Sequence, residues 1–183
     1  KGIKMKFPFT TVQSTDDSPL GPLILAATDT ALVGVFFHNQ AHLPELSHWP
    51  KVEKHPILQQ AQAELTEYFA GQRITFDVPL DLSSGTPFQQ AVWAALLQIP
   101  CGATTSYGAI STLIGKPAAV RAVGGAVGRN PISIIVPCHR VVGANGTLTG
   151  YAGGLPRKIA LLQREGATPG HFPSSSLLTL SPS

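Results

Sequence analysis

The chain of 183 residues is long enough for one domain or two small ones with a buried core. Charged residues make up 13% and hydrophobic residues 43%, a composition that excludes an intrinsically disordered chain. The formal net charge of +3 is compatible with a nucleic-acid partner but does not require one. No run reaches the ~18 apolar residues of a membrane span and no signal-peptide pattern opens the chain, so we expect a cytoplasmic protein, or a nuclear one in a eukaryote.

Residues 1–80 are predicted to form an α+β unit. Two apolar runs, 23–27 and 31–37, flank Thr28-Asp29-Thr30, a pattern that predicts a β-hairpin with a tight turn. Residues 39–55 contain prolines and scattered polar groups, and we expect them to form a loop.

A helix is predicted from Ile57 to Ala70, because apolar residues recur there every three or four positions and Gly71 follows as a stop. Residues 73–78 are a further strand candidate. Four histidines in this half are irregularly spaced and have no cysteine nearby, so we interpret them as surface residues and expect no metal site: His38, His42, His48 and His55.

Residues 81–86 have the composition of a linker, and a helix follows them. Thr86 and Gln89 are placed to form a capping box, and Pro87 occupies the first helical position. Pro100 ends this helix. Its predicted core face consists of Phe88, Val92, Ala95, Leu96 and Ile99.

Two short helices are predicted next, one capped by Ser106 and spanning 107–114, the other spanning 117–128. Gly115 between them supplies a tight turn, so the pair suggests a helix-turn-helix.

The second of these helices has two contrasting faces. Valines share the face predicted to pack inward: Val120, Val123 and Val127. The opposite face carries very small side chains and one arginine: Ala118, Ala122, Gly125 and Arg129. Such a face permits close approach to DNA, and because it lacks base-reading side chains the minor groove is favoured. Helix–helix packing is the alternative. Arg121 lies on the flank, where it could pair with a carboxylate or enter a duplex.

Residues 134–136 form an apolar run predicted as a buried strand, and Pro137 ends it. Cys138 follows, beside His139 and Arg140, which could supply a base and the positive potential that lowers a thiol pKa. This pattern predicts a nucleophilic cysteine, with a buried structural cysteine as the alternative. The second cysteine, Cys101, has no adjoining His or cation, and we interpret it as a bystander.

A glycine-rich loop, Gly150–Gly154, surrounds Tyr151 and lacks the spacing of phosphate-binding loops, so we expect it to wrap a flat base. Glu165 ends the helix that follows, where the helix dipole disfavours its charge. Pairing with His139 would explain this position; a solvated glutamate is the alternative.

The motifs Pro-Cys-His-Arg-Val at 137–141, Gly-Tyr-Ala-Gly-Gly at 150–154 and Arg-Ala-Val-Gly-Gly at 121–125 occur together in this chain. In that order and spacing they resemble the O6-alkylguanine-DNA alkyltransferases, also called methylated-DNA–protein-cysteine methyltransferases. The resemblance is dense from about Thr86 to Gly166 and weak before that.

The resemblance implies an α/β (α+β) fold, with a small N-terminal antiparallel-sheet domain that is ribonuclease H-like and a C-terminal winged helix-turn-helix domain. We place these domains at 1–80 and 87–168, with the linker at 81–86 and a mobile tail at 169–183. The implied activity is direct-reversal repair: irreversible transfer of the alkyl group of O6-alkylguanine, and of O4-alkylthymine, from double-stranded DNA to Cys138. Base flipping precedes transfer, each molecule acts once, and the protein is expected to be a monomer that needs no cofactor.

The family's catalytic roles fall on Cys138 as nucleophile, His139 as base and Glu165 as the residue that orients it. Tyr107 corresponds to the tyrosine that favours base rotation and donates to guanine, and Arg121 to the residue that fills the gap in the stack.

DNA contact through the small helix face falls on Ala118, Ala122 and Gly125. The remaining correspondences are Asn130 as a structural bridge and a substrate pocket formed by Val141, Tyr151, Ala152 and Gly153. The chain departs from the pattern at Ala152, where many members have Ser, so contact with O6 there would rest on backbone N–H.

Two other functions remain open from the residues alone. A cysteine hydrolase would use Cys138 and His139 but would have no use for Arg121. A non-catalytic lesion-binding protein would resemble the family's alkyltransferase-like members, which lack the nucleophile that this chain has.

Overall fold

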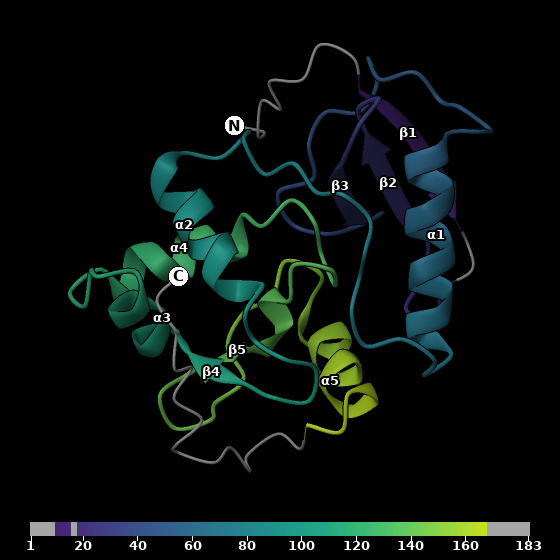
Figure 1. Cartoon of the computed structure of the whole chain (residues 1–183). Coiled ribbons are helices and arrows are strands. Elements are labelled where there is room, and N and C mark those ends of the chain that lie inside the picture. The colour runs from purple at the N-terminus through teal and green to yellow at the C-terminus, as the bar shows by residue number, and fades with distance from the viewer. Residues whose placement is uncertain (1–9, 16–17, 168–183) are drawn as a thin grey trace.

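The structure, a computed structural model, describes residues 10–15 and 18–167. Figure 1 shows a sheet with one long helix beside a group of shorter helices. We call these the N-terminal unit (residues 10–80) and the C-terminal unit (residues 87–167). The expected mixed fold, an antiparallel sheet followed by a mainly helical unit, is confirmed. The predicted tail lies outside the described residues, and within them no helix is long and apolar enough to cross a membrane.

Three antiparallel strands form the sheet of the N-terminal unit in the order β1 (Thr11–Thr15), β2 (Leu23–Ala27) and β3 (Leu32–Phe37). The amide of Thr28 donates to the carbonyl of Ala31 at 2.9 Å and closes the turn, so the predicted hairpin is confirmed. Both faces of the sheet are covered, because successive side chains alternate between the main core and a smaller cluster made of Val12, Ala26, Val33 and Phe36.

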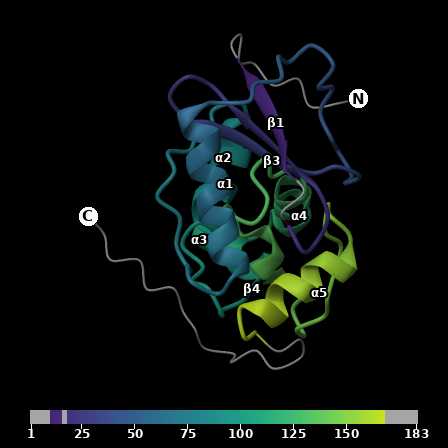
Figure 2. The same cartoon turned by 90° about the vertical axis from the view of Figure 1, so that its right-hand side faces the viewer.

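Helix α1 (Pro56–Phe69) packs on this sheet, as Figure 2 shows, and confirms the predicted helix. Gly71 takes a φ of +75° just beyond its end. The strand candidate at 73–78 is wrong. The buried carboxylate of Glu64 accepts from the amides of Asp77 and Val78, so a side chain satisfies groups that a strand partner would otherwise bind.

The outer edge of β3 joins the two units. The amide of Leu32 donates to Pro79 and its carbonyl accepts from Asp81, so the linker begins as an extension of the sheet. Further along the same edge, the amide of Val35 donates to Pro131 at 2.9 Å and its carbonyl accepts from Ser133 at 3.0 Å. The segment that leads to Cys138 is therefore fixed to the N-terminal sheet.

The C-terminal unit contains helices α2 (Pro87–Leu96), α3 (Tyr107–Leu113), α4 (Val120–Gly128) and α5 (Leu155–Arg164), the one-turn helix η1 (Cys138–Arg140), and the short parallel strands β4 (Thr105–Ser106) and β5 (Val141–Val142). The predicted capping box is confirmed, because Thr86 and Gln89 bond each other's backbone amides through their side chains. The indole of Trp93 donates to the carbonyl of Ala126 at 2.9 Å and locks α2 against α4.

Helix α4 begins at Val120, three residues later than predicted. The residues before it form a turn in which the amide of Ala119 donates to Lys116. Val120 is 41% exposed, so its assignment to the inward face is wrong, whereas Val123 and Val127 are buried as expected. The prediction of an outward face is confirmed within the helix for Ala122 and Gly125, which are exposed, whereas Ala118 is exposed in the preceding turn and Arg129 is exposed at the C-cap.

Residues 134–136 do not form the predicted strand. They lie in tight turns in which the amide of Ile135 donates to Ser133 and that of Val136 donates to Ile132. Ile134 is buried with a φ of +72°, a conformation rare for a β-branched residue. The apolar character of the run reflects burial of this turn, and burial alone does not distinguish a turn from a strand.

Candidate active site

Cys138 is the first residue of η1 and lies against a cavity of about 530 Å³. Its side chain is 4% exposed, and burial raises the pKa of the thiol, although Asn130, Lys158 and nearby backbone amides oppose this. The expectation that the side chains of His139 and Arg140 lower the pKa of this thiol is wrong, because burial raises it and neither side chain is among the groups that oppose burial.

The next residue, His139, is fully buried, and its Nε2 lies 2.7 Å from Oε1 of Glu165. Pairing of these two residues was expected from the position of Glu165 and is confirmed. Nδ1 of His139 is buried and has no hydrogen-bond partner among the residues that the structure describes. It is thus the ring nitrogen able to take up a proton. Burial lowers the pKa of His139, so the ring is neutral at rest.

Glu165 receives hydrogen bonds from three residues. Arg140 donates from Nε and Nη2 to the two carboxylate oxygens, at 2.8 Å each, and its Nη1 donates to the carbonyl of Ile99. The hydroxyl of Tyr68, on α1 of the N-terminal unit, donates to Oε1 at 2.7 Å. Desolvation opposes the charge of Glu165, but the bonds from His139 and Arg140 outweigh it and hold its pKa well below the usual range. Arg140 thus anchors the carboxylate instead of acting on the thiol.

A buried lysine lies close to Cys138 and His139. Lys158 of α5 is fully buried, and its Nζ donates to the carbonyls of Val141 at 2.6 Å and Thr149 at 3.1 Å. Burial lowers its pKa to about 8, against the opposing effect of Cys138. Lys158 therefore ties the strand after η1 to the loop that precedes Tyr151, and it places a positive charge near the thiol.

Asn130 closes the turn that precedes Cys138. Its amide Nδ2 donates to the carbonyl of Val136 at 2.8 Å, and its Oδ1 accepts from the amide of Ile132 at 3.0 Å. The side chain is buried and also contributes a hydrogen bond that opposes the raised pKa of Cys138. This geometry fits the bridging role that we predicted for Asn130 between α4 and the segment carrying the thiol.

Replacing Asn130 by Ala is expected to lower the free energy of unfolding by about 2 kcal/mol, because buried backbone groups lose their partner. The pKa of Cys138 should rise further, which slows its reaction with iodoacetamide at neutral pH. Urea unfolding and the pH dependence of that reaction test both effects. Asn145→Ala, at an exposed turn, is the matched control; equal results for the two variants would refute a bridging role for Asn130.

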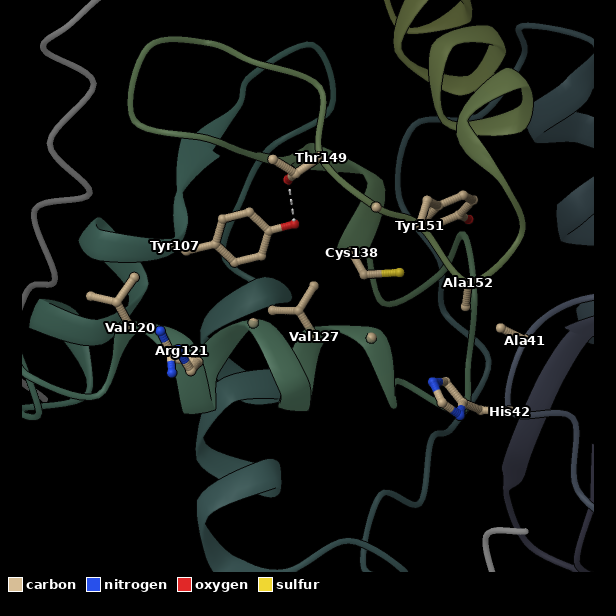
Figure 3. A pocket seen from close by; sticks show the side chains of 13 residues that line it. Ala41, His42, Tyr107, Val120, Arg121, Val127, Cys138, Thr149, Tyr151 and Ala152 are labelled. Carbon is tan, nitrogen blue, oxygen red and sulfur yellow. Dashed lines mark hydrogen bonds between the residues drawn. The ribbon is translucent and has the colours of Figure 1, made fainter. Parts of the chain in front are cut away.

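Figure 3 shows the cavity with Tyr107, Arg121, Cys138, Tyr151 and Ala152 around it; of the four residues predicted to form the substrate pocket, Tyr151 and Ala152 line it. The hydroxyl of Thr149 donates to that of Tyr107 at 2.9 Å, so the proton of Tyr107 remains available to another acceptor. Arg121 is exposed at the first turn of α4. The ring of Tyr151 meets that of Phe37 edge to face, with centroids 6.4 Å apart.

Other predicted site residues lie outside the lining. Val141 is fully buried, and its carbonyl accepts from Lys158. Gly153 packs against the ring of Phe37. The residues predicted to contact DNA are exposed: Ala122 and Gly125 lie on α4, and Ala118 lies in the turn before it. No group of three or more His, Cys, Asp or Glu in residues 10–15 and 18–167 could hold a metal ion.

Sequence reasoning missed Tyr68, Lys158 and the lining residues Ala41 and His42. Lys158 had a detectable signal, because it shares one helical face with Leu161, Leu162 and Glu165 and is the only cation on that face. The other three had none, since they approach the site from the N-terminal unit only after folding.

Two family models together match most of the chain. One is described as "6-O-methylguanine DNA methyltransferase, ribonuclease-like domain" and matches residues 11–82. The other, "6-O-methylguanine DNA methyltransferase, DNA binding domain", matches residues 87–167.

Individual relatives agree with these matches. The methylated-DNA–protein-cysteine methyltransferase of Mycobacterium tuberculosis is 53% identical over 151 residues, which is 82% of this chain and 90% of that protein. The protein of the same name from Methanosarcina acetivorans is 49% identical over 152 residues, 82% of this chain and 96% of that one. A crystal structure of Mycobacterium tuberculosis OGT in complex with DNA is 50% identical and superposes with a TM-score of 0.79, covering 85% of this chain and 92% of that one.

Proposed function

This chain belongs to the 6-O-methylguanine DNA methyltransferase family, and from that premise we propose that Cys138 takes the alkyl group directly from O6-alkylguanine in double-stranded DNA. Its function is direct-reversal DNA repair, its activity is that of a methylated-DNA–protein-cysteine methyltransferase, and DNA is its partner. The roles of individual residues, the groove and the oligomeric state are our proposals, and the local geometry supports the first two. We propose that the protein acts as a monomer.

Helix α4 is the element that we propose to enter the minor groove. Its outer face carries only small side chains and Arg129, so the backbone can approach the duplex closely without reading base edges. The alkylated atom lies inside the stack, and the base must therefore leave the helix at a cost of a few kcal/mol. Arg121, exposed at the rim of the cavity, fills the gap that the base leaves, and Tyr107 crowds the backbone beside it.

The flipped guanine rests in the cavity between Tyr107 and Tyr151. His139 accepts the thiol proton at Nδ1, and Glu165 stabilises the imidazolium through Nε2. Lys158 lies close enough to favour the thiolate electrostatically.

The sulfur then attacks the alkyl carbon. A carbon–sulfur bond forms, the carbon–O6 bond breaks, and both electrons of the broken bond go to O6. The guanine anion is stabilised by a hydrogen bond from Tyr107 and takes up one proton, which balances the proton lost by the thiol. The products are guanine and a thioether on Cys138, which water does not hydrolyse, so each molecule reacts once.

The observation that carries this proposal is the buried Cys138 at the cavity, followed in the chain by His139, whose Nε2 lies 2.7 Å from Oε1 of Glu165. The test is mass spectrometry of the protein after mixing with a duplex containing O6-methylguanine. We expect a gain of one methyl group per chain, on the peptide that contains Cys138. Repeated turnover would instead indicate a hydrolase, and binding without a mass change would indicate a lesion-binding protein.

Arg121→Ala is expected to slow repair at saturating concentrations of alkylated duplex by roughly 30-fold, about 2 kcal/mol. The reason is that no side chain then fills the gap in the base stack when the guanine is flipped out. Reaction with the free base O6-benzylguanine should be unaffected, since no flipping is required. Arg129→Ala removes the same charge from the other end of α4 and controls for general attraction to DNA. Equal slowing on duplex and free base would show that Arg121 serves chemistry or stability.

A further inference from the structure

The cavity beside Cys138 is built by both units of the chain. Most of its lining comes from the C-terminal unit, but Ala41 and His42 come from the loop that follows β3. In Figure 3 these two residues lie on the side of Ala152, whereas Arg121 lies at the opposite end of α4, with Cys138 between them. The sulfur points toward the side of Tyr151 and Ala152.

Several contacts hold this loop in place. The amide of Ala41 donates to the carbonyl of Ala152 at 2.9 Å. Arg157 of α5 donates to Oδ1 of Asn39 at 2.8 Å and to the carbonyl of Gly153 at 3.0 Å, and its guanidinium lies 4.4 Å from the ring centre of Phe37. The loop is therefore a fixed wall, bonded to the same segment that carries Tyr151.

His42 occupies an unusual backbone conformation in this wall. Its φ is +59°, in the left-handed region that few residues other than glycine adopt, although histidine is among those found there more often. Its side chain is exposed, and Figure 3 shows the ring at the edge of the cavity. Residues held in sparsely populated backbone conformations cluster at active sites and ligand-binding sites.

We propose that His42, together with Ala41, limits the size of the alkyl group that the cavity accepts, so that the N-terminal unit sets substrate range. This inference rests on the proposed function. The base occupies the space beside Tyr107, and the reacting carbon must lie between O6 and the sulfur. In a larger alkyl group, the atoms beyond that carbon then project into the space bounded by Tyr151, Ala152 and the loop that carries Ala41 and His42.

The experiment compares two duplexes of identical sequence that carry either O6-methylguanine or O6-benzylguanine at one position. Single-turnover rate constants are measured for wild type, His42→Gly and His48→Gly. Glycine suits the positive φ of residue 42, and His48 is an exposed histidine of the same unit outside the cavity. We expect His42→Gly to raise the ratio of benzyl to methyl rate constants on the order of tenfold, and His48→Gly to leave it unchanged.

His42→Asn, which tolerates the same φ and has a shorter side chain, should give an intermediate ratio. An unchanged ratio in both His42 variants would overturn the proposal. So would equal slowing on the two duplexes with normal reaction of free O6-benzylguanine, because His42 would then contact DNA rather than the alkyl group. Absence of methyl transfer in the wild type would contradict the proposed function itself, which is a separate result.

Discussion

Replacing Cys138 by Ser is expected to reduce alkyl transfer below detection while leaving affinity for alkylated duplex within about threefold, a change under ~1 kcal/mol. Serine has nearly the size of cysteine, so the buried turn formed by η1 should persist. Its hydroxyl is far less acidic than a thiol, however, and His139 cannot generate a useful nucleophile from it.

Two measurements on the Cys138→Ser protein test this expectation. Transfer is followed by mass spectrometry, and binding is followed by fluorescence anisotropy with a labelled O6-methylguanine duplex. Cys101→Ser is the matched control, because Cys101 is a second free thiol that lies outside the cavity. Stoichiometric transfer by the Cys138→Ser protein, or loss of transfer in the Cys101→Ser protein, would show that Cys138 is not the nucleophile.

Glu165→Gln is expected to have the second largest effect, on both stability and rate. Four hydrogen bonds from Tyr68, His139 and Arg140 converge on the two carboxylate oxygens. A glutamine offers only one acceptor oxygen, and its NH2 group would face side chains that are themselves donors. The substitution also leaves the buried Arg140 without its counter-charge. We therefore expect the free energy of unfolding to fall by about 3–5 kcal/mol at neutral pH.

The loss should depend on pH in a defined direction. The folded-state pKa of Glu165 lies well below the unfolded value of about 4.3, so its stabilisation is complete above that value and is lost as pH falls toward the folded-state pKa. The stability difference between wild type and Glu165→Gln should thus be constant from pH 6 to 8 and shrink below about pH 4. Urea unfolding across this range measures it.

The reaction rate provides a second test of Glu165. Without the carboxylate the imidazolium of His139 is less stable, so reaction with free O6-benzylguanine should slow at neutral pH and partly recover at higher pH, where the thiolate forms unaided. Because the thiol and imidazole titrate together, the shift belongs to the pair. Tyr68→Phe removes one donor and keeps the charge, so its profile should resemble wild type. Superimposable pH–rate profiles for wild type and Glu165→Gln would show that Glu165 does not stabilise the imidazolium of His139.

Local rules were sufficient for several elements of the fold. The capping box of Thr86 and Gln89 and the turn at Thr28 formed as predicted, because neighbouring residues satisfy those backbone groups. The exposure of Ala122 and Gly125 on α4 followed from helical periodicity. Local rules were insufficient for Val120, whose exposure depends on where the preceding turn ends and the helix begins.

The sequence by itself determined the family, the mixed fold and the pairing of His139 with Glu165, and it singled out Cys138 as the proposed nucleophile, because motif spacing and helix-end electrostatics are local properties. Tertiary structure alone decided that residues 134–136 turn rather than extend, that Arg140 bonds Glu165, and that burial raises the pKa of the Cys138 thiol. It also brought Tyr68 and His42 to the site from the N-terminal unit. These features depend on burial and on contacts between segments far apart in sequence, and neither quantity is encoded in residue spacing.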